Sequence, residues 1–403
     1  MKEDNRHSSL VTRHPTYQRI MSLLGILFLS LSLYAQLDAG RDDTINPGVP
    51  VTLTAQYGLI GNGITISDDG VEGPFPIGFS FNFFGNSYTQ FYIGANGWIS
   101  FSPNPNAQGT RQAFAVPSAA DFNPKNCILG PFEDLNPSLT GSPYILYRTI
   151  GDTSAPKLLV MWCETPMYGC TNLNTTFQIV LNEGTNTIEN HLYHKPVCLD
   201  WLDGKATLGL QNSTGYIGFA APGKNATVWS ADLQAWQFSP TSVDSFQVTP
   251  IAYDLQPLTS ANKISWRWYE GSEIVSEEQE CIVTPLETTT YIAWVQICNG
   301  QEFTDTVTVH VIPYIPNAFT PNGDGLNDEF RIVGIPHENI TRFQMEIYNR
   351  WGERIFHTAD ILEGWDGTWN NGPCPSDTYI WVIGYEDGKK HKVTNHGSVI
   401  LMR

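Results

Sequence analysis

The chain has 403 residues, with 22 Lys and Arg against 40 Asp and Glu, so its formal net charge is −18. This acidic balance argues against nucleic acids and anionic membrane surfaces as partners, because phosphate is neutralised by clustered Lys and Arg. Hydrophobic residues make up 41% of the chain, which excludes a disordered polypeptide.

The first 35 residues have the pattern of a secretory signal peptide. Four basic residues precede the apolar run 21–34, and Ala35 and Gln36 follow it as the expected cleavage site. The run is too short to span a bilayer, which takes about 20 residues. We therefore expect residues 1–35 to be removed, and the remaining chain to be exported and not to be an integral membrane protein.

Alternation of apolar and polar residues dominates the chain after this leader and predicts short antiparallel strands. Residues 77–83 alternate in this way, and Asn96-Gly97 is typical of a two-residue hairpin turn. No segment after the leader has the pattern of a ten-residue helix. The sequence thus predicts an all-β, multidomain chain of antiparallel β-sandwiches, in which residues 36–240 form a large, jelly-roll-like sandwich.

Residues 241–312 have the strand spacing of an immunoglobulin-like sandwich. Trp266, Trp268 and Trp294 lie on its expected strands, and we interpret them as core residues rather than as a carbohydrate-stacking surface. Prolines after residue 312 mark a boundary, and residues 313–403 are expected to form a third module.

The seven cysteines are expected to pair within modules, because exported proteins form disulfides. Cys281–Cys298 is predicted inside the small sandwich, and Cys163–Cys170 across a tight reversal that Pro166 and Gly169 permit. The cysteines then left are Cys127, Cys198 and Cys374. A Cys127–Cys198 disulfide is the weaker prediction. No pair of cysteines has zinc-like spacing.

The last part of the chain carries five short motifs, at residues 317–328, 347–356, 365–367, 377–379 and 397–403. In the order and spacing of these motifs, residues 317–403 resemble the C-terminal domain of gliding-motility-associated proteins, the type B sorting domain of the type IX secretion system. The resemblance implies a β-sandwich that is recognised by this machinery, with an outer-membrane receptor as partner, and that directs export and attachment to or release from the cell surface. One departure lies at residues 375–378, where the family usually has a glycine before the Thr-Tyr pair. The matching motif residues are Asn322, Gly323, Asp324, Gly325, Asn327, Asp328, Tyr348, Asn349, Arg350, Trp351, Gly352, Trp365, Asp366, Gly367, Tyr379 and Arg403.

Two weaker resemblances concern the earlier part of the chain. Residues 73–101 look like a sandwich module that is common in the same secreted proteins. Residues 39–55 resemble the opening strands of a PKD- or immunoglobulin-like repeat, whose closing strands resemble residues 264–312. Two alternatives stay open: the large sandwich is inserted into the small domain, or residues 39–55 are a strand of the large sandwich.

The loop 322–328 is the best candidate for a cofactor site, and calcium is the ion it would suit. Its oxygen-bearing side chains resemble the first half of a calcium loop, although the later bidentate glutamate is absent. The alternative is a turn whose side chains bond their own backbone. The candidate ligands are Asn322, Asp324, Asn327 and Asp328.

Other clusters of polar residues are interpreted as structural. Glu189 and His191 would share one face of a strand while His194 points away, so a zinc site is disfavoured and His191 is expected to be partly exposed. Paired acidic residues such as Asp68-Asp69 are interpreted as solvated turns. Trp351, Trp365 and Trp381 are expected to fill the core of the last module.

No catalytic motif for a hydrolase or a phosphate-binding loop is present. We therefore expect a non-enzymatic protein of the cell surface or the medium, with sandwiches that serve adhesion or structure. A lectin-like module that binds a surface glycan or protein ligand is the alternative, and a secreted hydrolase using Asp or Glu pairs is a weaker one.

Overall fold

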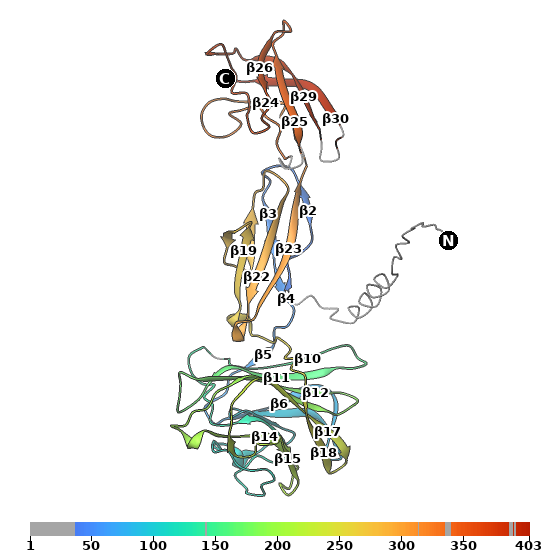
Figure 1. Cartoon of the computed structure of the whole chain (residues 1–403), viewed down its shortest axis with the longest axis vertical. Helices are drawn as coiled ribbons and strands as arrows, with labels where there is room; N and C mark the ends of the chain where they lie inside the picture. Colours follow the sequence, from blue (N-terminus) through green and yellow to red (C-terminus); the bar gives the residue numbers. More distant parts are fainter. Residues whose placement is uncertain (1–36, 142, 313, 335–339, 387–389, 391) are drawn as a thin grey trace, which may run out of the picture. The chain divides into compact units, whose positions relative to one another are not determined.

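The computed structural model describes residues 37–403, apart from 142, 313, 335–339, 387–389 and 391 (Figure 1). The expected signal peptide and its cleavage site therefore lie outside the described residues. The described residues form β-strands joined by turns and short 3-10 segments, which confirms the all-β prediction. Within this part of the chain, no helix is long and apolar enough to cross a membrane.

The large sandwich consists of two seven-stranded sheets. Its first sheet runs in the order β18-β17-β13-β12-β11-β10-β5, and the second in the order β15-β14-β9-β8-β7-β6, with β16 beside β14. The strands of the first sheet are β5 (Asn62–Ile64), β10 (Ile145–Ile150), β11 (Lys157–Pro166), β12 (Asn174–Asn182), β13 (Ile188–Lys195), β17 (Ala231–Ser242) and β18 (Ser245–Ile251). Those of the second are β6 (Val71–Phe83), β7 (Asn86–Gly94), β8 (Trp98–Ser100), β9 (Cys127–Phe132), β14 (Lys205–Gln211), β15 (Gly218–Ala220) and β16 (Thr227–Val228), and two short 3-10 segments are η1 (Pro105–Ala107) and η2 (Leu202–Gly204).

Alternating side chains build the core between these two sheets. Along β6, the side chains of Ile77, Phe79, Phe81 and Phe83 are buried, while the residues between them are exposed. Burying such an apolar face is the main favourable term in folding, at about 25 cal/mol per Å² of apolar surface. The period of two in the sequence is thus the direct cause of this layer.

The first sheet continues beyond residue 240, where the sequence analysis ends the large sandwich. β17 runs through Pro240 to Ser242, and β18 returns beside it, pairing Phe246 with Pro240. Proline is tolerated here although it lacks an N–H donor. Residues 243–244 turn the chain into a hairpin just beyond the domain boundary that the sequence suggested after residue 240.

The small sandwich is assembled from two separate parts of the chain. β2 pairs in parallel with β23, and β3 pairs antiparallel with β21, so the segment containing residues 39–55 belongs to this domain (Figure 1). The large sandwich is inserted between the two parts. The strands are β1 (Leu37–Asp38), β2 (Asp43–Ile45), β3 (Val51–Thr54), β4 (Gln56–Tyr57), β19 (Ser265–Glu270), β20 (Glu273–Ser276), β21 (Glu280–Val283), β22 (Thr289–Gln296) and β23 (Glu302–Val311), with the 3-10 segments η3 (Ala261–Lys263) and η4 (Cys298–Gly300).

The tryptophans of this domain divide between its two faces. Trp268 is buried in the core, and Trp266 packs against the same cluster. Trp294 lies directly across from Arg267 on the neighbouring strand, and the Arg267 guanidinium carbon stands 4.8 Å from its ring centroid. The prediction that Trp294 is a core residue is therefore wrong, because its strand position points to the outer face.

The C-terminal domain has a five-stranded sheet in the order β24-β30-β29-β25-β26. Its core contains Phe319, Phe330, Trp365 and Tyr379, and the last two rings meet edge to face with centroids 4.8 Å apart. The strands are β24 (Ala318–Phe319), β25 (Thr341–Tyr348), β26 (Arg354–Thr358), β27 (Thr368–Trp369), β28 (Gly372–Pro373), β29 (Asp377–Glu386) and β30 (Lys392–Leu401).

The two disulfides differ from the predicted pairs. Cys163 is bonded to Cys298, and Cys170 to Cys198, with Cα–Cα distances of 6.2 and 5.9 Å. The predictions Cys163–Cys170, Cys281–Cys298 and Cys127–Cys198 are therefore wrong. Cys163 follows the core residue Trp162 on β11, so its side chain points to the opposite face of the sheet and joins a cluster with Leu258 and Cys298. The remaining three cysteines are free and buried: Cys127, Cys281 and Cys374.

Candidate functional site

The motif residues of the C-terminal domain lie mainly in three turns, and each turn is held by local hydrogen bonds. In the loop 322–328, the Asp328 carboxylate accepts backbone N–H bonds from Asn322, Gly323 and Gly325, at 2.9, 2.7 and 2.8 Å. The bonds from Gly323 and Gly325 contribute most to lowering the pKa of Asp328 below its usual value, because they stabilise the charged carboxylate.

Asp324 in the same loop also bonds to neighbouring groups. Its carboxylate accepts the Leu326 N–H at 2.8 Å and the Asn322 side-chain amide at 2.9 Å. Asn327 adopts a positive φ of 53°, which asparagine tolerates. This geometry is that of the turn alternative, in which the side chains bond their own backbone. Calcium at Asn322, Asp324, Asn327 and Asp328 stays a prediction.

The second turn, between β25 and β26, displays an exposed tryptophan. The side-chain oxygen of Asn349 accepts the N–H groups of Trp351 and Glu353, both at 3.0 Å, and Gly352 supplies a positive φ of 76°. Trp351 is 84% exposed. The prediction that it fills the core is wrong, because the tip of a hairpin has no packed layer on either side. Trp365 and Trp381 are buried as expected.

Ion pairs flank this tryptophan. Arg350 pairs with Asp377 at the start of β29, and Arg354 pairs with Glu346 at 2.5 Å. The Tyr348 hydroxyl donates to the other oxygen of Glu346 at 2.8 Å. The hydrogen bonds from Arg354 and Tyr348 hold the pKa of Glu346 below its usual value. These charged side chains thus fix the hairpin against β29 and on itself.

The third turn joins Trp365-Asp366-Gly367 to Arg403. The Asp366 carboxylate accepts the Thr368 N–H at 2.9 Å, and Gly367 has a positive φ of 76°. A Cβ on Gly367 would lie 2.5 Å from a Leu401 methyl carbon, so a larger residue does not fit. Arg403 donates from Nη2 to the Gly367 carbonyl at 2.9 Å. Motif residues far apart in the sequence therefore meet in one structural unit.

The departure at residues 375–378 does not break this unit. The Pro375 carbonyl accepts the Tyr379 hydroxyl at 2.9 Å, and the Ser376 hydroxyl accepts the Arg403 N–H at 3.1 Å. Pro375 and Ser376, in the segment that departs from the family pattern, therefore still bond to two other motif positions.

A shallow groove of about 280 Å³ lies beside the exposed tryptophan. Trp351 and Trp369 provide aromatic surface, and the Arg350–Asp377 pair provides charge. This groove is the candidate recognition site of the C-terminal domain. Its lining residues are Asn349, Arg350, Trp351, Ile355, Trp369, Cys374, Pro375, Asp377 and Tyr379.

The histidine cluster on β13 has no arrangement for a metal ion. His191 is buried rather than partly exposed, so that prediction is wrong; its Nε2 lies 2.9 Å from Glu189, and its Nδ1 accepts the Asp254 N–H at 3.1 Å. His194 is exposed and lies 2.6 Å from Asp232. Both nitrogens of His191 thus have protein partners, which is the reason for its burial.

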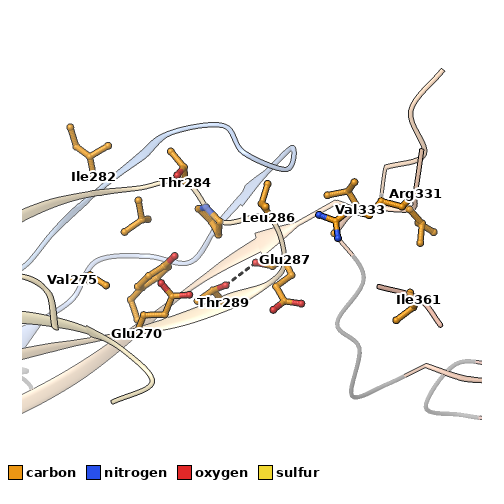
Figure 2. Close-up of a pocket in the computed structure, with 15 residues that line it drawn as sticks. Glu270, Val275, Ile282, Thr284, Leu286, Glu287, Thr289, Arg331, Val333 and Ile361 are labelled. Atoms are coloured by element: carbon orange, nitrogen blue, oxygen red, sulfur yellow. Dashed lines mark hydrogen bonds between the residues drawn. The ribbon is translucent and has the colours of Figure 1, made fainter. Parts of the chain in front are cut away.

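One end of the small sandwich carries a surface of mixed polar and apolar residues (Figure 2). Val275, Ile282 and Leu286 contribute to it, and the Thr289 hydroxyl donates to the Glu287 carbonyl at 2.8 Å. None of the fifteen residues drawn is a Ser, Cys or His.

One cluster that the sequence analysis missed lies in the large sandwich. It joins Asp68 and Asp69, interpreted there as a solvated turn, to Asp134, which is buried. The separation of more than sixty residues left no local pattern that could have indicated it.

The turns, the hairpin and the C-terminal strand define the last module as a β domain with its own core. Residues 314–401 match the family model of the CHU_C type IX secretion signal domain, so the chain carries the sorting domain that its motifs resemble. This signal implies interaction with the secretion machinery and export to the cell surface or the extracellular space. Residues 51–250 match a second family model, described as NIDO related.

No curated protein matches the chain. Among solved structures, it is similar to Bacteroides ovatus SGBP-B of a mixed-linkage glucan utilization locus, in complex with a mixed-linkage heptasaccharide, at 14% identity over 40% of each chain and a TM-score of 0.14. It thus spans less than half of that protein.

Two further structures are similar at the same level. Fibronectin(III)-like modules of Clostridium thermocellum CbhA are 12% identical, over 42% of this chain and 84% of that one, with a TM-score of 0.13. A tetra-tandem repeat from the extending region of a large adhesion protein is 8% identical, over 89% and 98%, with a TM-score of 0.17. Such scores carry no functional inference.

Proposed function

We propose that the protein is a non-enzymatic component of the cell surface or the surrounding medium. Its C-terminal domain addresses it to the type IX machinery, and its two preceding sandwiches serve adhesion or surface structure. The observation that carries this proposal is the match of residues 314–401 to the secretion signal domain.

The shape of the acidic cluster supports a role other than glycoside hydrolysis. A hydrolase needs a cleft for its sugar and two carboxyl groups about 5–10 Å apart within it. The cavity beside Asp134 has a volume of only about 10 Å³, which is about the room of one water molecule. A sugar ring does not fit there.

The rigid turns of the C-terminal domain support its role as an address. Asn349, Asp366 and Asp328 hold their turns by bonds to backbone N–H groups. A receptor that binds such a surface orders fewer groups than one that binds an unstructured tail, so less conformational entropy is lost on binding. Trp351 is the exposed anchor of this surface.

Deletion of residues 313–403 tests the proposal. In a host with the type IX machinery, the truncated protein should accumulate in the periplasm, and a leader–reporter fusion that carries residues 313–403 should leave the cell. The same fusion in a strain without the machinery is the control. Arrival of the truncated protein at the surface or in the medium would show that residues 313–403 are only another sandwich.

A lectin-like role for the large sandwich is the second candidate, and its exposed loop aromatics favour it. Tyr216 is 77% exposed in the turn between β14 and β15, and Phe122 is exposed in the loop before β9. Such side chains can stack on sugar rings. Binding of the purified protein to a glycan array, lost in Tyr216→Ala, would support this role; an empty array would favour the structural one.

A further inference from the structure

Three aspartates from two distant loops of the large sandwich meet at one point. Asp68 and Asp69 lie in the loop between β5 and β6, and Asp134 follows β9. One carboxylate oxygen from each residue lies within 4.8 Å of the other two. Like charges at this distance repel, so the fold must compensate for holding them together.

The side chain of Asp134 is the best evidence for a missing partner. It is only 5% exposed. Its Oδ2 accepts the indole N–H of Trp201 at 2.6 Å, but its Oδ1 is buried without a hydrogen-bond partner among the described residues. Oδ1 of Asp68 is buried without a partner in the same way. Unpaired buried oxygens are rare because each loses its hydration without replacement.

The surrounding side chains supply too little positive charge. Asp69 accepts the Asn96 side-chain amide at 2.6 Å, and its other oxygen lies 3.9 Å from Arg111, which is half exposed. Lys205 lines the cavity beside Asp134 but pairs with Asp203 at 3.0 Å. One guanidinium thus faces three carboxylates.

The adjacent buried pair does not compensate for this excess either. Glu133 and Lys195 bond to each other at 2.7 Å, so their charges cancel.

The crowding of these carboxylates also changes their acidity. Burial, the main cause, and the charges of Asp69 and Asp68 raise the pKa of Asp134 to about 6. Burial likewise raises the pKa of Asp68. A cation would give the unpartnered oxygens of Asp68 and Asp134 a partner.

We propose that Asp68, Asp69 and Asp134 bind a calcium ion. Carboxylate oxygens are hard ligands, and calcium accepts six to eight oxygens in flexible geometry, whereas magnesium demands a near-ideal octahedron. Asp68 and Asp69 are only half buried, so water has access to complete the coordination.

The ion would fasten the loop before β6 to the loop after β9. The Asp134 carbonyl also accepts the Tyr168 N–H at 3.0 Å, close in sequence to the Cys170–Cys198 disulfide. Calcium thereby stabilises one end of the large sandwich.

Thermal unfolding of the full protein, with calcium against sodium chloride of equal ionic strength, tests the site. At calcium about a hundredfold above its dissociation constant, the melting temperature of the large sandwich should rise by about 5–10 °C. Asp134→Asn keeps an acceptor for Trp201 but removes a charge, so it should lose this rise and melt no lower than the native protein without calcium. Asp68→Asn, at a half-buried position, is the second variant, and it should also lose the rise.

A control variant separates this site from the loop 322–328. Asp328→Asn should keep the calcium-dependent rise. Terbium, a calcium mimic, should give luminescence excited through Trp201, and this signal should disappear in Asp134→Asn.

Four outcomes would overturn the proposal. The first two are that calcium does not raise the melting temperature of the native protein, or that it raises it fully in both Asp134→Asn and Asp68→Asn. The other two are that magnesium raises the melting temperature as much as calcium does, or that only Asp328→Asn loses the calcium-dependent rise.

Discussion

The large sandwich and the C-terminal domain are both antiparallel β-structures, but different contacts hold them. The large sandwich depends on contacts between residues far apart in sequence: the Cys170–Cys198 disulfide and the buried Lys195–Glu133 pair. The C-terminal domain contains a single cysteine, which is free, and its turns are closed by side chains that bond backbone groups a few residues away. Short-range contacts leave a local motif in the sequence, whereas a contact between distant residues leaves no local pattern.

Two tryptophans of the C-terminal domain have different roles. Trp365 lies in the core and donates from Nε1 to the Thr368 carbonyl at 2.9 Å. Trp351 sits at an exposed hairpin tip held by Asn349. The first tryptophan maintains the fold, and the second is available to a partner.

The largest effect is expected for Trp365→Ala. Truncating a buried Trp costs about 3–5 kcal/mol, a large part of the stability of a domain this small, so the C-terminal domain should unfold and export should stop. Trp351→Ala is the matched control: exposed substitutions change stability by about 0.5 kcal/mol or less, so the domain should stay folded. Hydrogen exchange of the full protein would localise the loss of stability.

Export of the two variants then tests the recognition surface. If Trp351 anchors the receptor, Trp351→Ala should remain folded and yet stay in the periplasm. Normal export of a folded Trp351→Ala protein would remove this residue from the recognition surface. Unfolding of that variant would show that the hairpin tip contributes to the fold after all.

In the large sandwich, Lys195→Met should lower the stability by about 3 kcal/mol. Lys195 is buried against Glu133 at 2.7 Å, and removing one partner leaves an unpaired carboxylate in the interior. Burial raises the pKa of Glu133, and without Lys195 this carboxyl can take up a proton, which limits the loss. Lys205→Met, which breaks the exposed pair with Asp203, should cost less than about 1 kcal/mol. Urea unfolding followed by hydrogen exchange in β12 and β13 would compare them, and equal losses would contradict the role given to burial.

The strands can be predicted from the sequence because they follow from the local alternation of apolar and polar residues. Alternation along residues 77–83 places each Phe on the inner face, and Asn96-Gly97 forms the turn between β7 and β8. The sorting motif is equally readable, since Asn349 and Asp366 act within their own turns.

The cysteines and the aspartate cluster show why the rest could not be predicted. Cys163 and Cys170 are close in sequence, but the pleat of β11 directs Cys163 to the face opposite Trp162, where Cys298 arrives from the next domain. Asp134 follows β9 and Asp68 precedes β6, two strands that are not neighbours in their sheet, so these residues meet only in the finished fold. Such pairings depend on the finished topology rather than on any local pattern.

The smallest effect is expected in the loop 322–328, where two explanations of the same residues can be separated by pH and chelation. The pKa of Asp328 is lowered in the folded protein, chiefly by the bonds from Gly323 and Gly325, so its contribution to stability is present at neutral pH. That contribution should be lost as the pH falls below about 4, through the lowered folded pKa of Asp328. The Asp328→Asn variant should melt at a slightly lower temperature at pH 7 and should lack this pH dependence.

If the loop is only a turn, EDTA leaves the melting temperature of the C-terminal domain unchanged, because backbone N–H groups already satisfy the Asp328 carboxylate. If Asp324 and Asp328 hold calcium, EDTA lowers the melting temperature of the C-terminal domain in the native protein and not in Asp328→Asn, since an ion that binds only the folded state stabilises that state.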